Sequence, residues 1–442
     1  MEALIPRFVL GFVAWAWLGV AQAALDIQHW STPQGARVLF VQNHGLPMLD
    51  VAVHFGAGSV RDTPERAGLA GLTRAMMELG AGSWTEAEIA ERLADVGAQL
   101  SGHFDRDRAG FNLRTLSSPP LREPALAVLA AILARPHFDV AVLERERART
   151  LARLREANTR PDVIGSRAFH AALYGAHPYG LPESGDEAGI AALQREDLVA
   201  FHARHYRAEN MIIALMGDIS REEAARVAGQ LAAGLPPGEV PELPLPVQAG
   251  AEGSEQVLPH HATQSHVFIG ALGMKRDDPD YFPLLVGNYV LGGGGFDSRI
   301  LDEIRQKRGL AYSAYSYFMP LADLGPFLIG LQTQREATDQ AVQVARDTLR
   351  RFIREGPSEA ELAQAKNNLI GSFPLRLDSN RKILDHLAML GFYRLTLDWL
   401  DRYPKQVDAV SGEAVTQAFR RRIDPDALHS VVVGGQADAG PR

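Results

Sequence analysis

Two stretches of the chain, about half its length apart, follow the same pattern. Residues 53–82 read VHFGAGSVRDTPERAGLAGLTRAMMELGAG, and residues 267–294 read VFIGALGMKRDDPDYFPLLVGNYVLGGG. Each begins with an apolar run typical of a buried strand, carries Asp-x-Pro a few residues later, and continues through a helix-length apolar segment into glycines. Self-similarity at a fixed spacing is typical of a repeated architecture. The pattern predicts a duplicated unit.

The ends of the two halves also match each other. Residues 196–218 read EDLVAFHARHYRAENMIIALMGD, and residues 413–435 read EAVTQAFRRRIDPDALHSVVVGG. Both indicate a helix, a polar turn, a buried strand and a glycine. The first match is offset by 214 residues (267 − 53) and the second by 217 (413 − 196). The alternative is a pair of generic helix–strand units, but two matches at nearly one offset favour a tandem duplication.

The predicted organisation is two α+β domains, each a mostly antiparallel sheet packed with helices. Strand pairs are followed by runs of helix rather than by strict alternation, which favours α+β over a doubly wound sheet. Residues 24–235 form the first predicted domain, the Pro/Gly-rich residues 236–256 a linker, and residues 257–442 the second domain. The elements predicted within them are strands at 36–42, 49–55, 211–216 and 428–433; helices at 143–157, 337–354 and 359–370, the last capped by Ser358; and a buried helix at 125–133 between Pro124 and Pro136.

Composition narrows the possible functions. The chain has 442 residues, 46% of them hydrophobic, with a net charge of −8 and no cysteine. It contains no basic block of five residues, so we expect no nucleic-acid binding. The absence of cysteine excludes disulfides, thiolate metal sites and cysteine nucleophiles. At the start, an apolar run at 8–20 precedes Ala-Gln-Ala at 21–23, which predicts a signal peptide over residues 1–23 and a periplasmic protein. The alternative, a membrane anchor, needs about 20 apolar residues.

Two longer motifs carry a resemblance to a known family. Residues 58–82 (GSVRDTPERAGLAGLTRAMMELGAG), residues 291–316 (LGGGGFDSRILDEIRQKRGLAYSAYS) and the duplication together resemble the pitrilysin/insulinase-type metallopeptidases. These are the inverzincins, which include the mitochondrial processing peptidases. The resemblance extends over the whole chain after the signal peptide. It implies H-x-x-E-H on a helix in catalytic members, with two His that bind zinc and a Glu that activates the metal-bound water.

This sequence departs from the family motif at the catalytic positions. Aligned with the family, the first His falls on Gly71, the Glu on Arg74 and the second His on Ala75. A third ligand, a glutamate, would fall near residues 152–153, where the sequence has Ala-Arg, and Glu156 is out of register. No H-x-x-E-H or H-E-x-x-H occurs in the sequence. We therefore expect no zinc on this chain and no hydrolysis by this chain alone.

Other family features are kept in the second half. Family members supply an Arg and a Tyr from an R-G-x-x-Y segment to the site of an H-x-x-E-H domain, and here these residues are Arg308 and Tyr312. A guanidinium and a phenol suit a peptide carbonyl that gains negative charge. Without the resemblance, Arg308 would be read as a surface ion pair and Tyr312 as a core residue. The run Gly292, Gly293, Gly294 and Gly295 is either a substrate-handling loop, as the resemblance implies, or a tight turn that begins a helix.

The histidines do not form a recognisable metal site in the sequence. His202 and His205 lie three residues apart on a predicted helix, without a carboxylate at a recognised third position. His260 and His261 are predicted at the beginning of a strand, where neighbouring side chains point to opposite faces. His177, in the segment His-Pro-Tyr-Gly, resembles a family loop that shapes the domain.

The sequence leaves two main hypotheses for function. In the first, the chain is the exported, non-catalytic subunit of a heterodimeric zinc peptidase that cleaves small or unfolded peptides. Its partner would be a homologous H-x-x-E-H subunit that holds the zinc, while this chain contributes Arg308 and Tyr312. In the second, it is a peptide-binding or scaffold protein of the cell envelope. An active peptidase with an unrecognised site is a third hypothesis.

Overall fold

The structure, a computed structural model, describes residues 25–238, 242, 244–248 and 252–434. Its strands are β1 Gln28–Ser31, β2 Arg37–Gln42, β3 Met48–Phe55, β4 Gln99–Phe104, β5 Ala109–Leu116, β6 Met211–Gly217, β7 Glu255–Leu258, β8 Gln264–Leu272, β9 Ala311–Phe318, β10 Pro326–Gln334 and β11 His429–Val433. Its α-helices are α1 Leu69–Met77, α2 Glu86–Asp95, α3 Pro119–Ala134, α4 Val140–Ala157, α5 Pro161–Tyr174, α6 Glu187–Ala192, α7 Arg195–His205, α8 Arg221–Ala232, α9 Tyr281–Asn288, α10 Arg299–Leu301, α11 Thr338–Glu355, α12 Glu359–Gly371, α13 Asn380–Phe392, α14 Trp399–Ala409 and α15 Gly412–Arg422.

The strands form two sheets with one shared topology. The first sheet has the order β1-β2-β6-β3-β5-β4, and the second has the order β7-β11-β8-β10-β9. Without β1 the two orders are equivalent, and in each sheet one parallel pair (β2 with β6, β7 with β11) sits beside antiparallel pairs. The predicted α+β fold with a duplicated, mostly antiparallel unit is confirmed.

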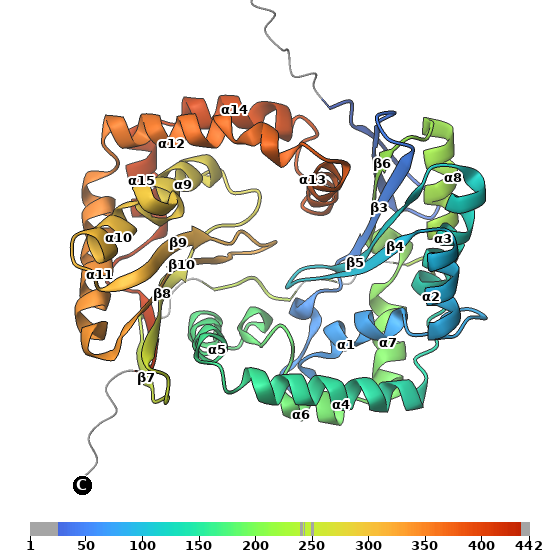
Figure 1. The fold of residues 1–442 in the computed structure, drawn as a ribbon, viewed down its shortest axis with the longest axis horizontal. Helices are drawn as coiled ribbons and strands as arrows, with labels where there is room; N and C mark the ends of the chain where they lie inside the picture. Colours follow the sequence, from blue (N-terminus) through green and yellow to red (C-terminus); the bar gives the residue numbers. More distant parts are fainter. Residues whose placement is uncertain (1–24, 239–241, 243, 249–251, 435–442) are drawn as a thin grey trace, which may run out of the picture.

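Each sheet is covered on one face by a helix from the other half (Figure 1). Helix α13 packs on β3 and β6, and α5 packs on β8 and β11. A glycine on each helix allows this close approach: a Cβ at Gly391 would lie 2.7 Å from Ile212, and one at Gly165 only 2.3 Å from the Phe268 ring. The two halves are therefore joined through their sheets rather than by the linker alone.

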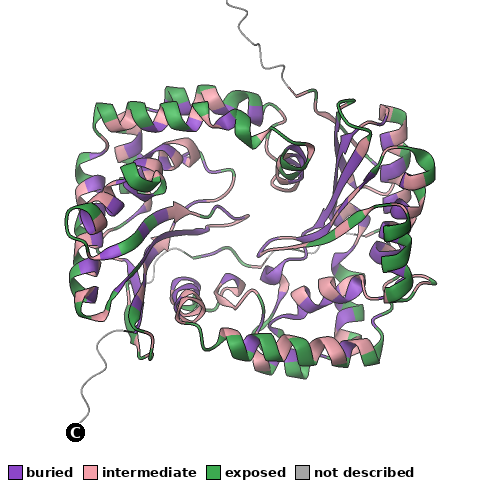
Figure 2. Cartoon of the chain, viewed as in Figure 1, coloured by how far each residue is buried: buried purple, intermediate pink, exposed green. Residues whose placement is uncertain are grey.

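Two of the three apolar cores contain residues from both halves, because α5 and α13 each pack on the sheet of the other half. One core lies within the first half, while a second combines Leu39 and Ala214 of the first sheet with Leu387 of α13. A third joins Phe169 of α5 to Val431 of the second sheet. Figure 2 shows the central strands buried and the outer helices exposed on their outward faces.

Local sequence signals account for many helix beginnings. Ser358 caps α12 in a capping box with Glu361, as predicted, and Ser220 does the same for α8 with Glu223. One expectation about a boundary is wrong: Pro124 lies inside α3 instead of bracketing a helix, because the helix already begins at Pro119. Proline suits the first helical position, where its missing N–H has no partner to lose.

The predicted signal peptide and part of the predicted linker fall on residues that the structure does not describe. The signal peptide predicted over residues 1–23 lies outside the described residues. The described residues between 236 and 254 form neither helix nor strand, but the predicted end of the linker is wrong, because Glu255 and Gln256 already pair with β11 as part of β7. Within the linker, Val247 donates its backbone N–H to Asp323 Oδ2 at 2.7 Å. Within the described chain, no helix combines the length and apolar character needed to cross a bilayer.

Candidate functional site

The degenerate motif positions line one cavity in the first half. Gly71, Arg74 and Ala75 lie on α1, and the cavity of about 700 Å³ lies between α1, α4 and α5. Helix α4 contributes Thr150 and Arg153 to its wall, next to the predicted place of the third ligand. The structure therefore brings the motif positions and the third-ligand segment together, as the family alignment predicts.

Arg74 is packed against the sheet beside this cavity. Its Nη1 donates to Glu78 Oε1 at 2.9 Å, and its guanidinium lies 5.8 Å from the centre of the Phe111 ring. The guanidinium lies directly against the backbone of β4 at Gly102. A Cβ at this position would lie 1.6 Å from Arg74 Nη1, so a larger residue there would displace the arginine. Burial raises the pKa of Glu78, and the neighbouring Arg74 opposes that shift.

The residues present do not fit a zinc ion. Zinc needs Cys, His or carboxylate ligands, and Gly71 and Ala75 have no side-chain donor atom while the Arg74 guanidinium is a cation. Across the described ranges, no group of three or more His, Asp or Glu side chains is arranged to hold a metal ion.

A second cavity, of about 760 Å³, lies in the second half. It is bounded by the end of α9, the segment 292–305 and the edge strand β9. Gly292, Gly293 and Gly295 line it, whereas Gly294 lies against the Tyr289 carbonyl. A Cβ at Gly292 would lie 2.5 Å from the Ser316 backbone nitrogen. Only glycine therefore allows the backbone at residue 292 to lie this close to β9.

Gly292 and Gly293 end a π-helical segment, Tyr289–Gly293, and Gly294 connects it to the next helical turn. Residues 295–297 form a single 3₁₀ turn, Gly295 has φ +64°, and α10 follows from Arg299. Only Gly295 therefore begins a helical segment, whereas Gly292 and Gly293 end the preceding one. The position of the glycine run on the cavity wall leaves the substrate-handling interpretation open as a proposal.

Tyr312 projects into solvent at the second cavity. It is 80% exposed, which excludes the core-packing alternative, and its hydroxyl has no hydrogen-bond partner among the described residues. The Arg305 guanidinium lies 4.5 Å from the centre of the Tyr312 ring and 5.0 Å from that of Phe296. Such cation–π contacts orient the ring and leave the hydroxyl available.

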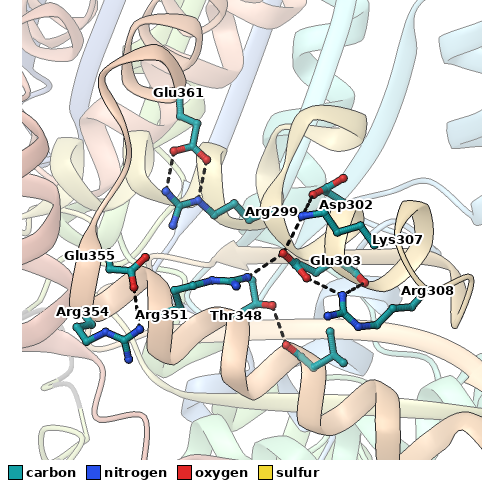
Figure 3. A network of polar contacts seen from close by, with 11 residues as sticks. Arg299, Asp302, Glu303, Lys307, Arg308, Thr348, Arg351, Arg354, Glu355 and Glu361 are labelled. Carbon is teal, nitrogen blue, oxygen red and sulfur yellow. Dashed lines mark hydrogen bonds and ion pairs between the residues drawn. The ribbon is translucent and has the colours of Figure 1, made fainter.

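Arg308 is held by an ion pair away from the lining of this cavity (Figure 3). Its Nη1 donates to Glu303 Oε2 at 2.6 Å and to the Glu303 carbonyl at 2.8 Å. Lys307 and Arg351 each contact Glu303 Oε1 at 2.9 Å. Burial raises the pKa of Glu303, but the hydrogen bonds from Lys307 and Arg308 outweigh it and bring the pKa to about 2. Arg305, and not Arg308, lines the cavity with Tyr312.

Comparison with known proteins identifies the family. The insulinase (peptidase family M16) model matches residues 37–187, and the model of the peptidase M16 inactive domain matches residues 192–369. A crystal structure of a peptidase M16 inactive domain from Pseudomonas fluorescens superposes with a TM-score of 0.89 at 36% identity, covering 94% of this chain and 100% of that chain. The chain belongs to the M16 peptidase family.

Curated M16 relatives include proteins with and without a peptidase name. The non-peptidase homolog YmxG of Helicobacter pylori is 24% identical, over 98% of this chain and 99% of that protein. The mitochondrial-processing peptidase subunit beta of Blastocladiella emersonii is 26% identical, over 91% of this chain and 87% of that protein. With glycine, arginine and alanine at the motif positions, this chain is a non-catalytic type of M16 member.

Two of the histidines that the sequence singles out serve local structure in this M16 chain. His202 Nε2 donates to the Leu133 carbonyl at 2.9 Å, and His177 Nδ1 accepts from the Tyr179 N–H, which shapes that loop as predicted. The expectation for His260 is wrong. It lies in the loop between β7 and β8, because its ring accepts from the Ala262 N–H and donates to the Thr159 carbonyl.

Sequence reasoning missed a buried aspartate that links the halves. Asp107 accepts hydrogen bonds from the Tyr179 hydroxyl, from the Tyr393 hydroxyl at 2.8 Å and from the Ala322 N–H at 2.9 Å. It also missed Arg305 and the buried His170. The only sequence signal near Asp107 was the charged turn DRDR at 105–108, which has no spacing that marks a site.

Proposed function

We propose that this chain is the exported, non-catalytic subunit of a heterodimeric zinc peptidase that cleaves small or unfolded peptides. The partner is a homologous H-x-x-E-H chain that holds the zinc, and this chain presents Tyr312 and Arg308 to the peptide carbonyl. The observation that carries the proposal is the Tyr312 side chain, 80% exposed at the rim of a cavity with its hydroxyl unpaired among the described residues. An exposed, oriented phenol suits a site completed by another chain.

The first half supports this division of labour. Its motif helix has neither metal ligands nor a base, so hydrolysis requires groups from elsewhere. Phenolic and guanidinium donors stabilise an oxyanion only when they are positioned before the reaction. The Arg305 contact provides that positioning for Tyr312.

Arg308 needs a rearrangement to take part. Its Glu303 ion pair is part of a network with two other cations, so Glu303 stays compensated when Arg308 turns away. Arg305 is the alternative cation, because it already lies on the cavity wall.

Co-expression with an H-x-x-E-H homologue from the same genome tests the proposal. We expect a 1:1 complex by size-exclusion chromatography with light scattering. Peptide cleavage should require both chains, and a chelator should abolish it. Failure of the chains to associate, or full activity of the H-x-x-E-H chain alone, contradicts the subunit proposal.

A peptide-binding envelope protein is the second candidate. The observation in its favour is that the second cavity is formed within one chain and has aromatic walls, including Tyr315, Tyr317 and Phe318. Under this hypothesis the purified chain binds peptides alone, and mixing with the H-x-x-E-H homologue produces no complex.

A further inference from the structure

The cavity of the first half has a wall rich in guanidinium groups. Of its charged lining residues, four are arginines, Arg74, Arg106, Arg153 and Arg167, and two are acids, Asp162 and Glu183. Arg74 is paired with Glu78, and Asp162 is paired with Arg160 at 2.6 Å. Burial raises the pKa of Glu183, which favours its neutral form, although Arg106 opposes the shift. The wall therefore carries more positive than negative charge.

Three of these guanidiniums have only neutral hydrogen-bond partners within the described part of the chain. Arg106, which is 8% exposed, donates to the Tyr179 and Leu181 carbonyls, Arg153 donates to the Thr150 hydroxyl, and Arg167 donates to the Asn158 side-chain oxygen. A carbonyl or hydroxyl partner does not neutralise a guanidinium, and the nearby carboxyl groups, Asp186 for Arg167 and Glu183 for Arg106, act on these arginines without a hydrogen bond to them. Such groups bind an incoming carboxylate through charge-assisted hydrogen bonds.

A buried acceptor lies in the same wall. His170 is 7% exposed, and its Nδ1 contacts the Ser166 carbonyl at 2.8 Å. Because a carbonyl can only accept, Nδ1 carries the proton and Nε2 is an acceptor. His170 Nε2 is buried and has no hydrogen-bond partner among the residues that the structure describes. A buried, unpaired acceptor is costly, and a ligand N–H would remove that cost.

We propose that this cavity binds the C-terminal end of a peptide. The terminal carboxylate takes hydrogen bonds from Arg106, Arg153 and Arg167, and an amide N–H of the last residues donates to His170 Nε2. Apolar wall residues, among them Phe104, Leu154 and Ile190, accommodate the last side chain. The volume of about 700 Å³ is sufficient for a few residues. This site belongs to the first half and goes beyond the proposed function, because it needs no partner chain and no cleavage.

The test compares two probes on the purified chain alone. N-acetyl-trialanyl-leucine with a free carboxylate and its C-terminal amide are titrated by isothermal calorimetry. We expect the acid to bind at least about tenfold tighter than the amide, since a lost charge-assisted bond is worth about one power of ten in affinity. Inorganic phosphate is a third probe, and we expect it to bind more weakly than the acid, because it has no N–H for His170 and no apolar body.

Variants locate the site. Arg153→Gln and Arg167→Gln should each weaken the acid about five- to tenfold and leave the amide unchanged. Arg149→Gln is the matched control, because Arg149 lies on the same helix but not on the cavity wall. Ala75→Asp places a carboxylate in the wall and should abolish the preference for the acid. Arg106 is left intact because it holds two loop carbonyls.

The outcomes that overturn the proposal are definite. If the acid and the amide bind with equal affinity, the cavity does not recognise a carboxylate. The same conclusion follows if the folded Arg153→Gln and Arg167→Gln variants still prefer the acid. If phosphate binds as tightly as the acid, the cavity is a general anion site, and the proposal that it binds peptides is wrong. Circular dichroism melting checks that each variant is folded.

Discussion

The two cavities lie beside equivalent helices of the duplicated halves and differ in their other walls and in chemistry. Each lies beside the helix that follows the central antiparallel strand (α1 after β3, α9 after β8) and beside an edge strand, β4 or β9. The cavity of the first half has an arginine-rich wall with a buried histidine acceptor. The cavity of the second half has aromatic walls and an exposed phenol. Equivalent helices therefore border a cavity in each half, while the side chains on its wall decide what each cavity can do.

The largest expected effect is on catalysis, and it should arise from the second cavity and not from the first. In the assembled complex, Tyr312→Phe should lower kcat by roughly ten- to a thousandfold with a smaller change in KM, because it removes one transition-state donor and keeps the ring. Arg308→Lys should also be damaging, since an ammonium does not reproduce the planar fork. Arg149→Gln, on α4 and outside the lining of both cavities, should leave kcat unchanged.

Steady-state kinetics on complexes of verified stoichiometry make this measurement. Wild-type rates for both Tyr312→Phe and Arg308→Lys would falsify the shared-site proposal. A loss of rate in Arg305→Gln together with a wild-type rate in Arg308→Lys would assign the cationic role to Arg305.

The next largest effect concerns the helices exchanged between the halves. Gly165→Val should destabilise the chain by about 1–3 kcal/mol, because overpacking forces a backbone or side-chain shift. Gly391→Val should cost less, because the approach at Gly165 is closer, 2.3 Å against 2.7 Å. Urea denaturation measures both. Gly371→Ala on α12 is the control, since a Cβ there meets nothing within 4 Å and should be neutral or stabilising.

A third prediction concerns the ionic network of the second half. Glu303→Gln should destabilise the chain by about 2 kcal/mol at pH 7, because it leaves three cations without their shared carboxylate. The pKa of Glu303 is lowered from 4.5 to about 2. Its stabilisation is therefore complete above pH 4.5 and is lost as the pH falls toward 2. Denaturation curves at pH 7 and pH 3 should show a smaller difference between variant and wild type at pH 3, and a constant difference would contradict this.

The smallest effect concerns the first half and has a different pH window. Burial, with Arg106 as a second cause, lowers the pKa of His170 from 6.5 to about 4. The unfolded chain therefore binds more protons between these values, so folding stability decreases as the pH falls from 6.5 toward 4. Between pH 7 and pH 5.5, the free energy of unfolding should therefore fall by about 1 kcal/mol less in His170→Gln than in the wild type. His29→Gln, on the exposed edge strand β1, is the control for replacing a histidine, and an unchanged pH dependence in His170→Gln would contradict the assignment.

The sequence alone was sufficient for the fold class and for the degenerate motif. Duplication appears as matching patterns because each half must bury a sheet with the same alternation of strand and helix. The lack of zinc ligands at Gly71, Arg74 and Ala75 is a matter of side-chain chemistry, which is independent of conformation. Capping by Ser358 is likewise local, since the N-cap and its partner lie three residues apart.

Other features depended on contacts between distant residues. The sequence motif pairs Arg308 with Tyr312, but Glu303 binds the Arg308 guanidinium and leaves Arg305 over the Tyr312 ring. The link from Asp107 to Tyr393 spans 286 residues, and the exchange of α5 and α13 depends on glycines that meet the opposite sheet. The arginines of the first cavity come from a turn and three helices that only tertiary packing brings together. Whether a charged side chain pairs internally or faces a cavity is decided by such long-range packing, and local patterns carry no information about it.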